Sequence, residues 1–158
     1  MSVSAILNNR WTQYIAGFII AMMVDPVCVF SQSQNVVPSL QEVEADTLVN
    51  RGNFEKAVSI YTTLIKKKKA SSQVLYKRAY AYYNLERYDE ALQDVSRYID
   101  ESNDPQGIVL RATIHEQIGN YTAELTDIDM LVAQHVSPEL LRWRASIAME
   151  AGAYAVAQ

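Results

Sequence analysis

Residues 75–99 read LYKRAYAYYNLERYDEALQDVSRYI and contain two apolar patterns of helical spacing, one on each side of Glu86. Apolar side chains recur there at intervals of three or four residues, which brings them to one face of a helix. They are Leu75, Ala79 and Tyr82 before Glu86, and Ala91, Val95, Tyr98 and Ile99 after it. The sequence therefore predicts two amphipathic helices joined by a short turn.

The same arrangement recurs along the chain. Its marker is an aromatic residue with a small residue nine positions before it and Ala, or a replacement, three positions after it. The aromatic residues Phe54, Tyr88, Tyr121 and Tyr154 follow one another at steps of 34, 33 and 33 residues. The small residues are Ala45, Ala79, Ala112 and Ala145, and the later positions hold Ala57, Ala91, Glu124 and Ala157. A period this regular predicts stacked helix hairpins.

Turn residues divide the chain at the same period. Gly52, Gly119 and Gly152 stand two positions before the aromatic residue, where glycine permits a tight turn, and Glu86 takes this place in the second unit. Asp104 with Pro105, and Ser137 with Pro138, mark the joints between units, because proline suits the first helical turn and Asp or Ser caps it. The expected units are residues 38–71, 72–104, 105–137 and a partial fourth, 138–158.

A helix hairpin of about 34 residues with small, glycine, aromatic and Ala positions in this order resembles the tetratricopeptide-repeat (TPR) family. The resemblance covers residues 38–158 and is strongest in the second unit. It departs from the family pattern at Gln41, which replaces a large apolar residue, and at Glu124, which replaces a small one. It implies an all-α fold, a right-handed superhelical solenoid.

In this family the first helices of successive units line a concave groove, with positions two, five, six, nine, twelve and thirteen pointing into it. The resemblance thus implies a partner-binding groove that includes Tyr76, Lys77, Tyr80, Tyr83, Asn84, Val109, Thr113, Arg142 and Trp143. Tyr and Trp suit recognition because each buries a large area at low rotamer cost and keeps a polar handle. Packing between helices is the alternative role for these tyrosines, and we prefer it for Tyr82.

One binding mode of the family holds a partner's terminal carboxylate with Lys or Arg at positions five, two and six. This chain has Glu42 and Asp46 at positions five and nine of its first unit, and Gln106 and Leu110 at positions two and six of its third. The cations of that clamp are absent, so we expect a different kind of partner segment.

The N-terminus has the order of a secretory signal. Arg10 precedes an apolar run, residues 14–24, which reads YIAGFIIAMMV. A helix over residues 11–24 would be about 21 Å long, short of the roughly 30 Å hydrocarbon core. Val29 and Ser31 favour cleavage before Gln32, which makes residues 1–31 a signal peptide and 32–37 a linker.

We therefore expect an exported, periplasmic or extracellular protein. The alternative is a membrane anchor formed by residues 11–30. Lipid attachment at Cys28 is a minor alternative, because the residue before Cys28 is Val27 rather than a small one.

Composition argues against several other functions. The formal charge of −4 leaves no surplus of cations for a nucleic-acid backbone. A single cysteine excludes an internal disulfide, and neither His115 nor His135 has a second ligand at metal-binding spacing. No phosphate-binding loop or nucleophile elbow occurs. We expect no enzyme activity, no cofactor and no bound metal.

The expected function is an exported protein-interaction module that binds a protein or peptide through an aromatic groove. Two alternatives stay open. One is a structural component that associates with itself or with an envelope complex, and the other is a regulatory segment of a longer protein. Both draw on the fourth unit, in which few residues follow Gly152 and the second helix is barely begun, so that it lacks the polar cap of a solenoid.

Overall fold

The computed structural model describes residues 38–67 and 71–156, with side chains described as far as Gly152. The expected signal peptide and linker lie outside the described residues, as does Ala157. Within the described part of the chain, no helix is both long and apolar enough to cross a membrane.

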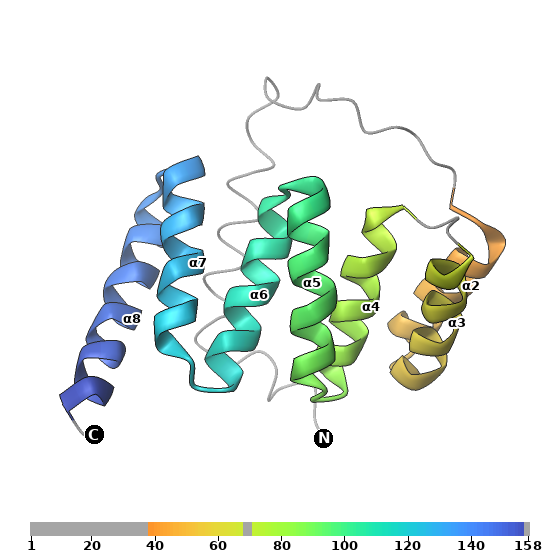
Figure 1. Ribbon diagram of the computed structural model, residues 1–158, viewed down its shortest axis with the longest axis horizontal. Coiled ribbons are helices and arrows are strands. Elements are labelled where there is room, and N and C mark those ends of the chain that lie inside the picture. The colour runs from red at the N-terminus through yellow and green to blue at the C-terminus, as the bar shows by residue number, and fades with distance from the viewer. Residues whose placement is uncertain (1–37, 68–70, 157–158) are drawn as a thin grey trace.

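The described residues form seven helices and no strand, so the predicted all-α fold is confirmed. The helices are α2 (Leu40–Asn50), α3 (Phe54–Lys66), α4 (Ser72–Asn84), α5 (Tyr88–Ser102), α6 (Pro105–Gln117), α7 (Tyr121–Gln134) and α8 (Pro138–Val156). Each packs against the next along the chain. Figure 1 shows them as a row, with α2 and α3 at one end and α8 at the other.

Three turns between paired helices share one backbone geometry. Gly52 and Gly119 have φ of +73°, and Glu86 has φ of 58° at the equivalent place. The next residue donates its N–H to a carbonyl five positions back: Asn53 to Leu48, Arg87 to Tyr82 and Asn120 to His115, at 2.8, 3.0 and 2.8 Å. This closing bond requires the left-handed conformation, which is why glycine is favoured there.

The fourth expected turn does not form. Helix α8 continues through Gly152 to Val156, so the prediction of a second helix after Gly152 is wrong for the described residues. Reversing the chain costs conformational entropy, which packing of a full second helix offsets in the other hairpins. Continuing α8 through Gly152 keeps the backbone hydrogen bonds of the helix without that cost.

Small residues lie where paired helices cross. Ala45, Ala79 and Ala112 are completely buried, as the repeat pattern predicts, whereas Ala145 is exposed on α8, which among the described helices contacts only α7. Gly107 lies in the first turn of α6, which approaches α5 so closely that a Cβ there would come 2.7 Å from Tyr98 Cδ1. Small side chains thus set the spacing both within and between hairpins.

A buried ion pair recurs in two hairpins. Arg78 of α4 contacts Asp94 of α5 at 2.6 Å, and Arg111 of α6 contacts Asp127 of α7 at 2.6 Å. In both pairs the aspartate follows the arginine by 16 residues, and its side chain is less than a tenth exposed. Each pair ties the first helix of a unit to the second.

The joints are capped as the sequence predicts. Asp104 Oδ1 accepts the N–H of Gln106 at 2.9 Å, with Pro105 in the first turn of α6. Ser137 Oγ accepts the N–H of Leu140 at 3.2 Å at the start of α8. Backbone groups that the helix leaves unsatisfied are therefore paired at both joints.

Candidate functional site

The first helices of the first three units lie beside one another. Helix α2 contacts α4, and α4 contacts α6, although a complete helix separates each pair in the sequence. We call the surface formed by positions two, five, six, nine, twelve and thirteen of α2, α4, α6 and α8 the first-helix face. It contains the positions at which the resemblance to the family implies a partner-binding groove.

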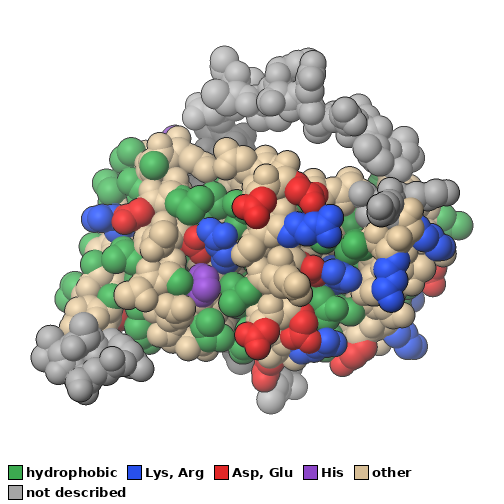
Figure 2. Space-filling model, viewed as in Figure 1, with side chains coloured by type: hydrophobic (Ala, Val, Ile, Leu, Met, Phe, Trp, Pro, Cys, Tyr) green, Lys and Arg blue, Asp and Glu red, His purple; other side chains and the backbone are tan. Residues whose placement is uncertain are grey.

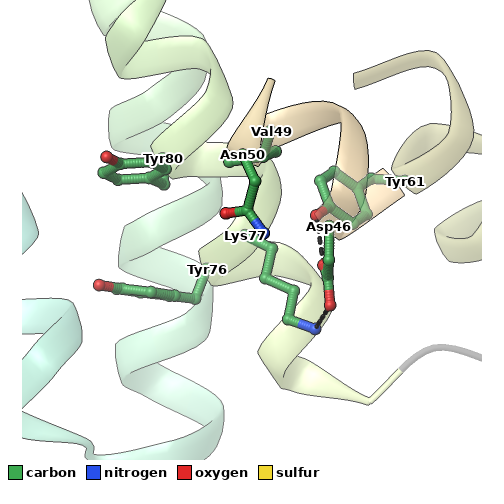
Figure 3. A pocket seen from close by; sticks show the side chains of 7 residues that line it. All are labelled: Asp46, Val49, Asn50, Tyr61, Tyr76, Lys77 and Tyr80. Carbon is green, nitrogen blue, oxygen red and sulfur yellow. Dashed lines mark hydrogen bonds and ion pairs between the residues drawn. The ribbon is translucent and has the colours of Figure 1, made fainter. Parts of the chain in front are cut away.

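A pocket of about 390 Å³ opens on this face between α2, α3 and α4. Its lining residues are Asp46, Val49, Asn50, Tyr61, Tyr76, Lys77 and Tyr80. Figure 3 shows the rings of Tyr76 and Tyr80 one above the other, across the pocket from Asp46 and Tyr61. The volume falls at the lower end of the range of about 300 to 1,000 Å³ found for ligand pockets.

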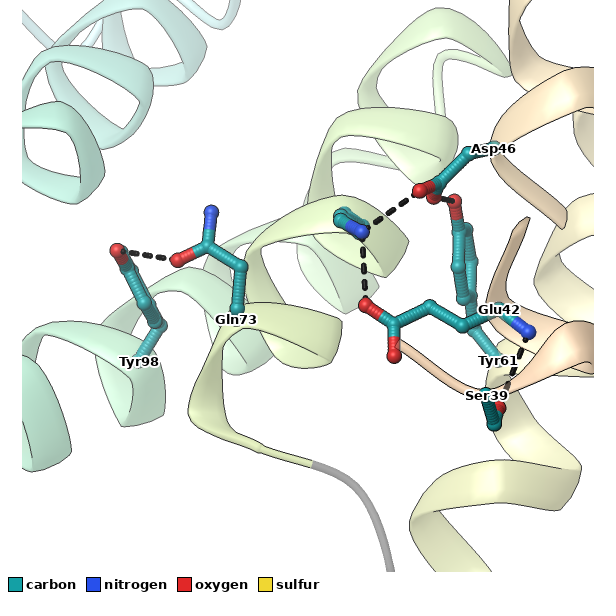
Figure 4. A network of polar contacts seen from close by, with 7 residues as sticks. Ser39, Glu42, Asp46, Tyr61, Gln73 and Tyr98 are labelled. Carbon is teal, nitrogen blue, oxygen red and sulfur yellow. Dashed lines mark hydrogen bonds and ion pairs between the residues drawn. The ribbon is translucent and has the colours of Figure 1, made fainter. Parts of the chain in front are cut away.

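Lys77 is held by two carboxylates of α2 (Figures 3 and 4). Its Nζ donates to Glu42 Oε1 at 2.8 Å and to Asp46 Oδ2 at 2.7 Å. Partial burial lowers the pKa of Lys77, but these hydrogen bonds outweigh it and raise the pKa above its ordinary value. The ammonium group therefore stays charged and links α4 to α2, and it does not stand free for a partner's carboxylate.

Tyr61 of α3 completes this network. Its hydroxyl donates to Asp46 Oδ1 at 2.6 Å, and its ring is 1% exposed in the core. Burial, together with the hydrogen bond to Asp46, raises the pKa of Tyr61 well above its ordinary value. The hydroxyl proton of Tyr61 is thus held in its hydrogen bond to Asp46.

Tyr76, Tyr80 and Tyr83 differ in exposure. Tyr80 is 41% exposed, whereas Tyr76 and Tyr83 are half-buried against the core. The ring of Tyr76 lies 5.3 Å from that of Tyr98, and the ring of Tyr83 lies 6.2 Å from that of Tyr88. Burial raises the pKa of both Tyr76 and Tyr83. Tyr80 is the most accessible aromatic group of the pocket, and Tyr76 is its braced neighbour.

Tyr83 and four further residues of the predicted groove line no part of the pocket. Asn84 is exposed at the end of α4 and donates to Tyr80 O at 2.8 Å. Val109 packs against the core, and Thr113 Oγ1 donates to Val109 O within α6. Arg142 is exposed on α8 and pairs with Glu139 at 3.1 Å. The side chains of Asn84, Thr113 and Arg142 therefore make these polar contacts within their own helices.

Trp143 is a core residue, contrary to its prediction as a groove residue. It is 5% exposed, and its Nε1 donates to Glu124 Oε1 at 3.2 Å. Glu124 is completely buried at the position where the repeat pattern places a small residue, and α6, α7 and α8 still pack together. Indole and carboxylate fill the space together, which removes Trp143 from the surface.

Four pocket residues were not among the predicted groove residues. Asp46, Val49 and Asn50 occupy positions nine, twelve and thirteen of the first unit, so the positional rule applied to that unit would have found them. Tyr61 comes from a second helix and obeys no groove rule. Only its spacing from Phe54 along α3 could have indicated burial.

Acidic and basic side chains are interspersed on the face of the molecule shown in Figure 2, and neither sign forms a continuous patch there. The described residues include no group of three or more His, Cys, Asp or Glu side chains placed to hold a metal ion.

Known proteins share this architecture. Residues 43–108 match the family model described as tetratricopeptide repeat. No curated protein matches the sequence. The second TPR domain of human RPAP3, solved in complex with an HSP70 peptide, is similar with a TM-score of 0.60 and 19% identity, over 68% of this chain and 92% of that domain.

Two further structures agree. The TPR2B domain of yeast Sti1, in complex with an Hsp70 peptide, is similar with a TM-score of 0.58 and 21% identity, over 73% of this chain and 99% of that one. A tetratricopeptide repeat protein from Parabacteroides merdae is similar with a TM-score of 0.63 and 20% identity, over 72% of this chain and 45% of that one. At these identities the structures show a shared fold. Together with the family match to residues 43–108, they show that the chain has the fold of tetratricopeptide-repeat domains.

Proposed function

We propose that this protein is an interaction module that binds a segment of another protein on its first-helix face, with the pocket between α2, α3 and α4 as the principal contact. The observation that carries the proposal is the pocket itself. It combines the exposed ring of Tyr80, the braced ring of Tyr76 and the partly exposed carboxylate of Asp46. Aromatic anchors beside a few polar groups are typical of surfaces where a small number of residues supply most of the binding energy.

The fold supports a peptide or an extended segment as the ligand. The similar domains of human RPAP3 and yeast Sti1 were solved with HSP70 peptides bound. The pocket of this chain has Lys77 already paired with Glu42 and Asp46, so a terminal carboxylate would meet no free cation there. The proposed partner therefore belongs to a different chemical class from a carboxylate tail.

Capture of the partner tests this proposal. The full chain, tagged at its C-terminus, would be used to recover proteins from an extract of its own cells, beside Tyr80→Ala and Gln93→Ala variants. Tyr80 is exposed in the pocket and Gln93 is exposed on α5, so neither change should unfold the chain. A partner that is lost with Tyr80→Ala and kept with Gln93→Ala supports the pocket. A partner that both variants retain places binding elsewhere.

We further propose that the protein is exported, on the strength of the apolar run at residues 14–24 and the cleavage pattern before Gln32. Mass spectrometry of the C-terminally tagged chain, purified from cell fractions, measures the N-terminus directly. A chain that starts at Gln32 and leaves the cytoplasmic fraction is the expected result. An intact N-terminus in the membrane fraction would favour the anchor formed by residues 11–30.

Self-association is a second candidate function, favoured by one face of α8. Leu141 is 47% exposed and Met149 is 76% exposed, and the exposed Ala145 lies between them on the same side of the helix. Sedimentation velocity over a range of concentrations tests it. Association that the double change Leu141→Ser with Met149→Ser abolishes would support this function, and a monomer at every concentration would remove it.

A further inference from the structure

The pocket on the first-helix face has two unlike walls. One wall consists of Tyr76 and Tyr80, which stand one helical turn apart on α4 (Figure 3). Tyr98 braces the ring of Tyr76 from the core side at 5.3 Å, and its own hydroxyl lies 2.6 Å from Asp104 Oδ2. A ring fixed in this way can receive a flat group on its open face with little loss of side-chain entropy.

The other wall contains a carboxylate with remaining capacity. Asp46 Oδ1 accepts from Tyr61 and Oδ2 accepts from Lys77, one bond to each oxygen. A carboxylate offers about four acceptor sites, so further donors can bind. The side chain of Asp46 is 37% exposed, which leaves it accessible from the pocket.

The charge around the pocket favours a cation. Lys77 faces two carboxylates, so this group of three has a net charge of −1. Among the described residues of the first-helix face, five carboxylates stand against two cations, and each cation already pairs with a carboxylate of the same face. The carboxylates are Glu42, Asp46, Glu116, Glu139 and Glu150, and the cations are Lys77 and Arg142. Such a surface attracts basic segments and repels acidic ones.

We infer that the pocket binds an arginine side chain of the partner, whose guanidinium lies against Tyr76 and Tyr80 and donates to Asp46. Arginine fits better than lysine because its planar group can stack on a ring and still present N–H groups at its edge to a carboxylate. The inference rests on the proposed function and goes further by naming the chemistry of the partner, which is a basic segment that contains arginine.

Selection from a peptide library tests this chemistry without knowledge of the partner. The full chain would be immobilised and used to select from random twelve-residue peptides displayed on phage, in parallel with Asp46→Asn, Tyr80→Ala and the control Gln93→Ala. Asparagine keeps the shape of Asp46 and an acceptor for Tyr61 while removing the charge. Enrichment of arginine with the wild-type chain and with Gln93→Ala, and its loss with the other two variants, is the expected result.

Substitution in the selected peptide then measures the contact without altering the protein. Replacing its arginine by glutamine should weaken binding by about tenfold in fluorescence anisotropy, and replacing it by lysine should weaken it less. The arginine-to-glutamine change should weaken binding to Asp46→Asn less than it weakens binding to the wild-type chain, because both changes remove the contact between arginine and Asp46.

The outcomes separate the inference from the proposed function. Selected peptides without basic residues, lost with Tyr80→Ala, would overturn the arginine inference and leave the binding site intact. Peptides that Tyr80→Ala binds as well as the wild-type chain does, or a selection that enriches nothing, would overturn both.

Discussion

Glu86 holds a backbone conformation that ordinarily belongs to glycine. Its φ of 58° matches the φ of +73° at Gly52 and Gly119, and the turn bond from Arg87 to Tyr82 requires it. A residue with a Cβ destabilises the folded state by about 1 to 2 kcal/mol in this conformation. Glycine avoids this strain, but part of its advantage is offset because its unfolded chain has more conformational entropy to lose on folding.

Glu86→Gly should therefore stabilise the protein by about 0.5 to 1 kcal/mol, measured by urea unfolding. Gly52→Ala and Gly119→Ala are the matched reverse changes. A Cβ at either glycine has no atom within 4 Å, so backbone strain alone should destabilise each variant by about 1 kcal/mol. A loss of stability in Glu86→Gly would show that the Glu86 side chain contributes more than its backbone costs.

Glu124 makes stability depend on pH. Burial raises the pKa of Glu124 to about 7, although the hydrogen bond from Trp143 opposes this; Glu150 and Asp127 add to the rise. Because the folded pKa is higher than the unfolded one, the folded state favours the protonated form. The contribution of Glu124 to stability is thus fully present below its unfolded pKa and is lost as the pH rises through about 7.

Glu124→Gln should remove this dependence while keeping an acceptor for Trp143. Relative to the variant, the wild-type chain should lose about 2 kcal/mol between pH 4.5 and pH 8. Urea unfolding at both pH values measures the difference, and Glu139→Gln on the surface of α8 serves as the control. Equal pH profiles for the wild type and Glu124→Gln would show that solvent reaches the carboxylate.

Residue-level roles were harder to predict from the sequence than the pattern that contains them. The positions of Tyr76 and Tyr80 followed from the repeat, and both line the pocket. The burial of Trp143 could not be predicted from the repeat, because it depends on Glu124, a residue of another helix that departs from the repeat pattern. A positional rule describes the average repeat and fails where one substitution changes a neighbour's environment.

At the scale of the elements, Gly107 shows how closely two helices approach. Alanine has a higher helix propensity than glycine by about 1 kcal/mol, which by itself predicts stabilisation. A Cβ at Gly107 would lie 2.7 Å from Tyr98 Cδ1 and 2.8 Å from Ile99 Cγ1. The Tyr98 ring is buried, and its hydroxyl lies within hydrogen-bonding distance of Gln73 and Asp104, so it has little room to move.

Gly107→Ala should accordingly destabilise the protein by about 1 to 2 kcal/mol, since the cost of overpacking exceeds the gain in propensity. Gln106→Ala, at the exposed neighbouring position of α6, is the control and should change the stability by less than about 0.5 kcal/mol. Thermal unfolding followed by circular dichroism gives both values. Stabilisation by Gly107→Ala would mean that α5 and α6 separate easily.

The elements themselves could largely be predicted. The apolar period of residues 75–99 predicts two helices and a turn, and α4 and α5 lie on either side of Glu86. Helix α8 differed from its prediction because Gly152, which stands two positions before an aromatic residue, was interpreted as a turn. Glycine permits a turn but does not enforce one, and the packing of a following helix decides. The ion pairs from Arg78 and Arg111 were not predicted, although their common spacing of 16 residues is visible in the sequence.

At the scale of the whole molecule, the hydrophobic core is divided. One cluster extends from α4 to α8, and a smaller one comprises Ala45, Ala57, Tyr61, Leu64 and Val74. The pocket lies near the boundary of the two, and its residues Lys77 and Asp46 link α4 to α2 across it. Sequence periodicity predicts the array, but the pocket and this division depend on three-dimensional packing that a repeat pattern does not specify.

Because repeat arrays open locally, the hairpin of α2 and α3 should unfold on its own more often than the larger cluster does. Lys77→Met leaves Glu42 and Asp46 without their shared cation, so amide hydrogen exchange in α2 and α3 should accelerate by about tenfold, with less than about twofold change in α6 and α7. Arg142→Met, which removes an exposed pair on α8, should leave α2 and α3 unchanged. Equal acceleration in every helix would instead show one cooperative unit.

If the hairpin does open separately, a ligand in the pocket contacts both sides of the boundary and should slow exchange in α2 and α3, which makes exchange a readout of binding as well as of stability.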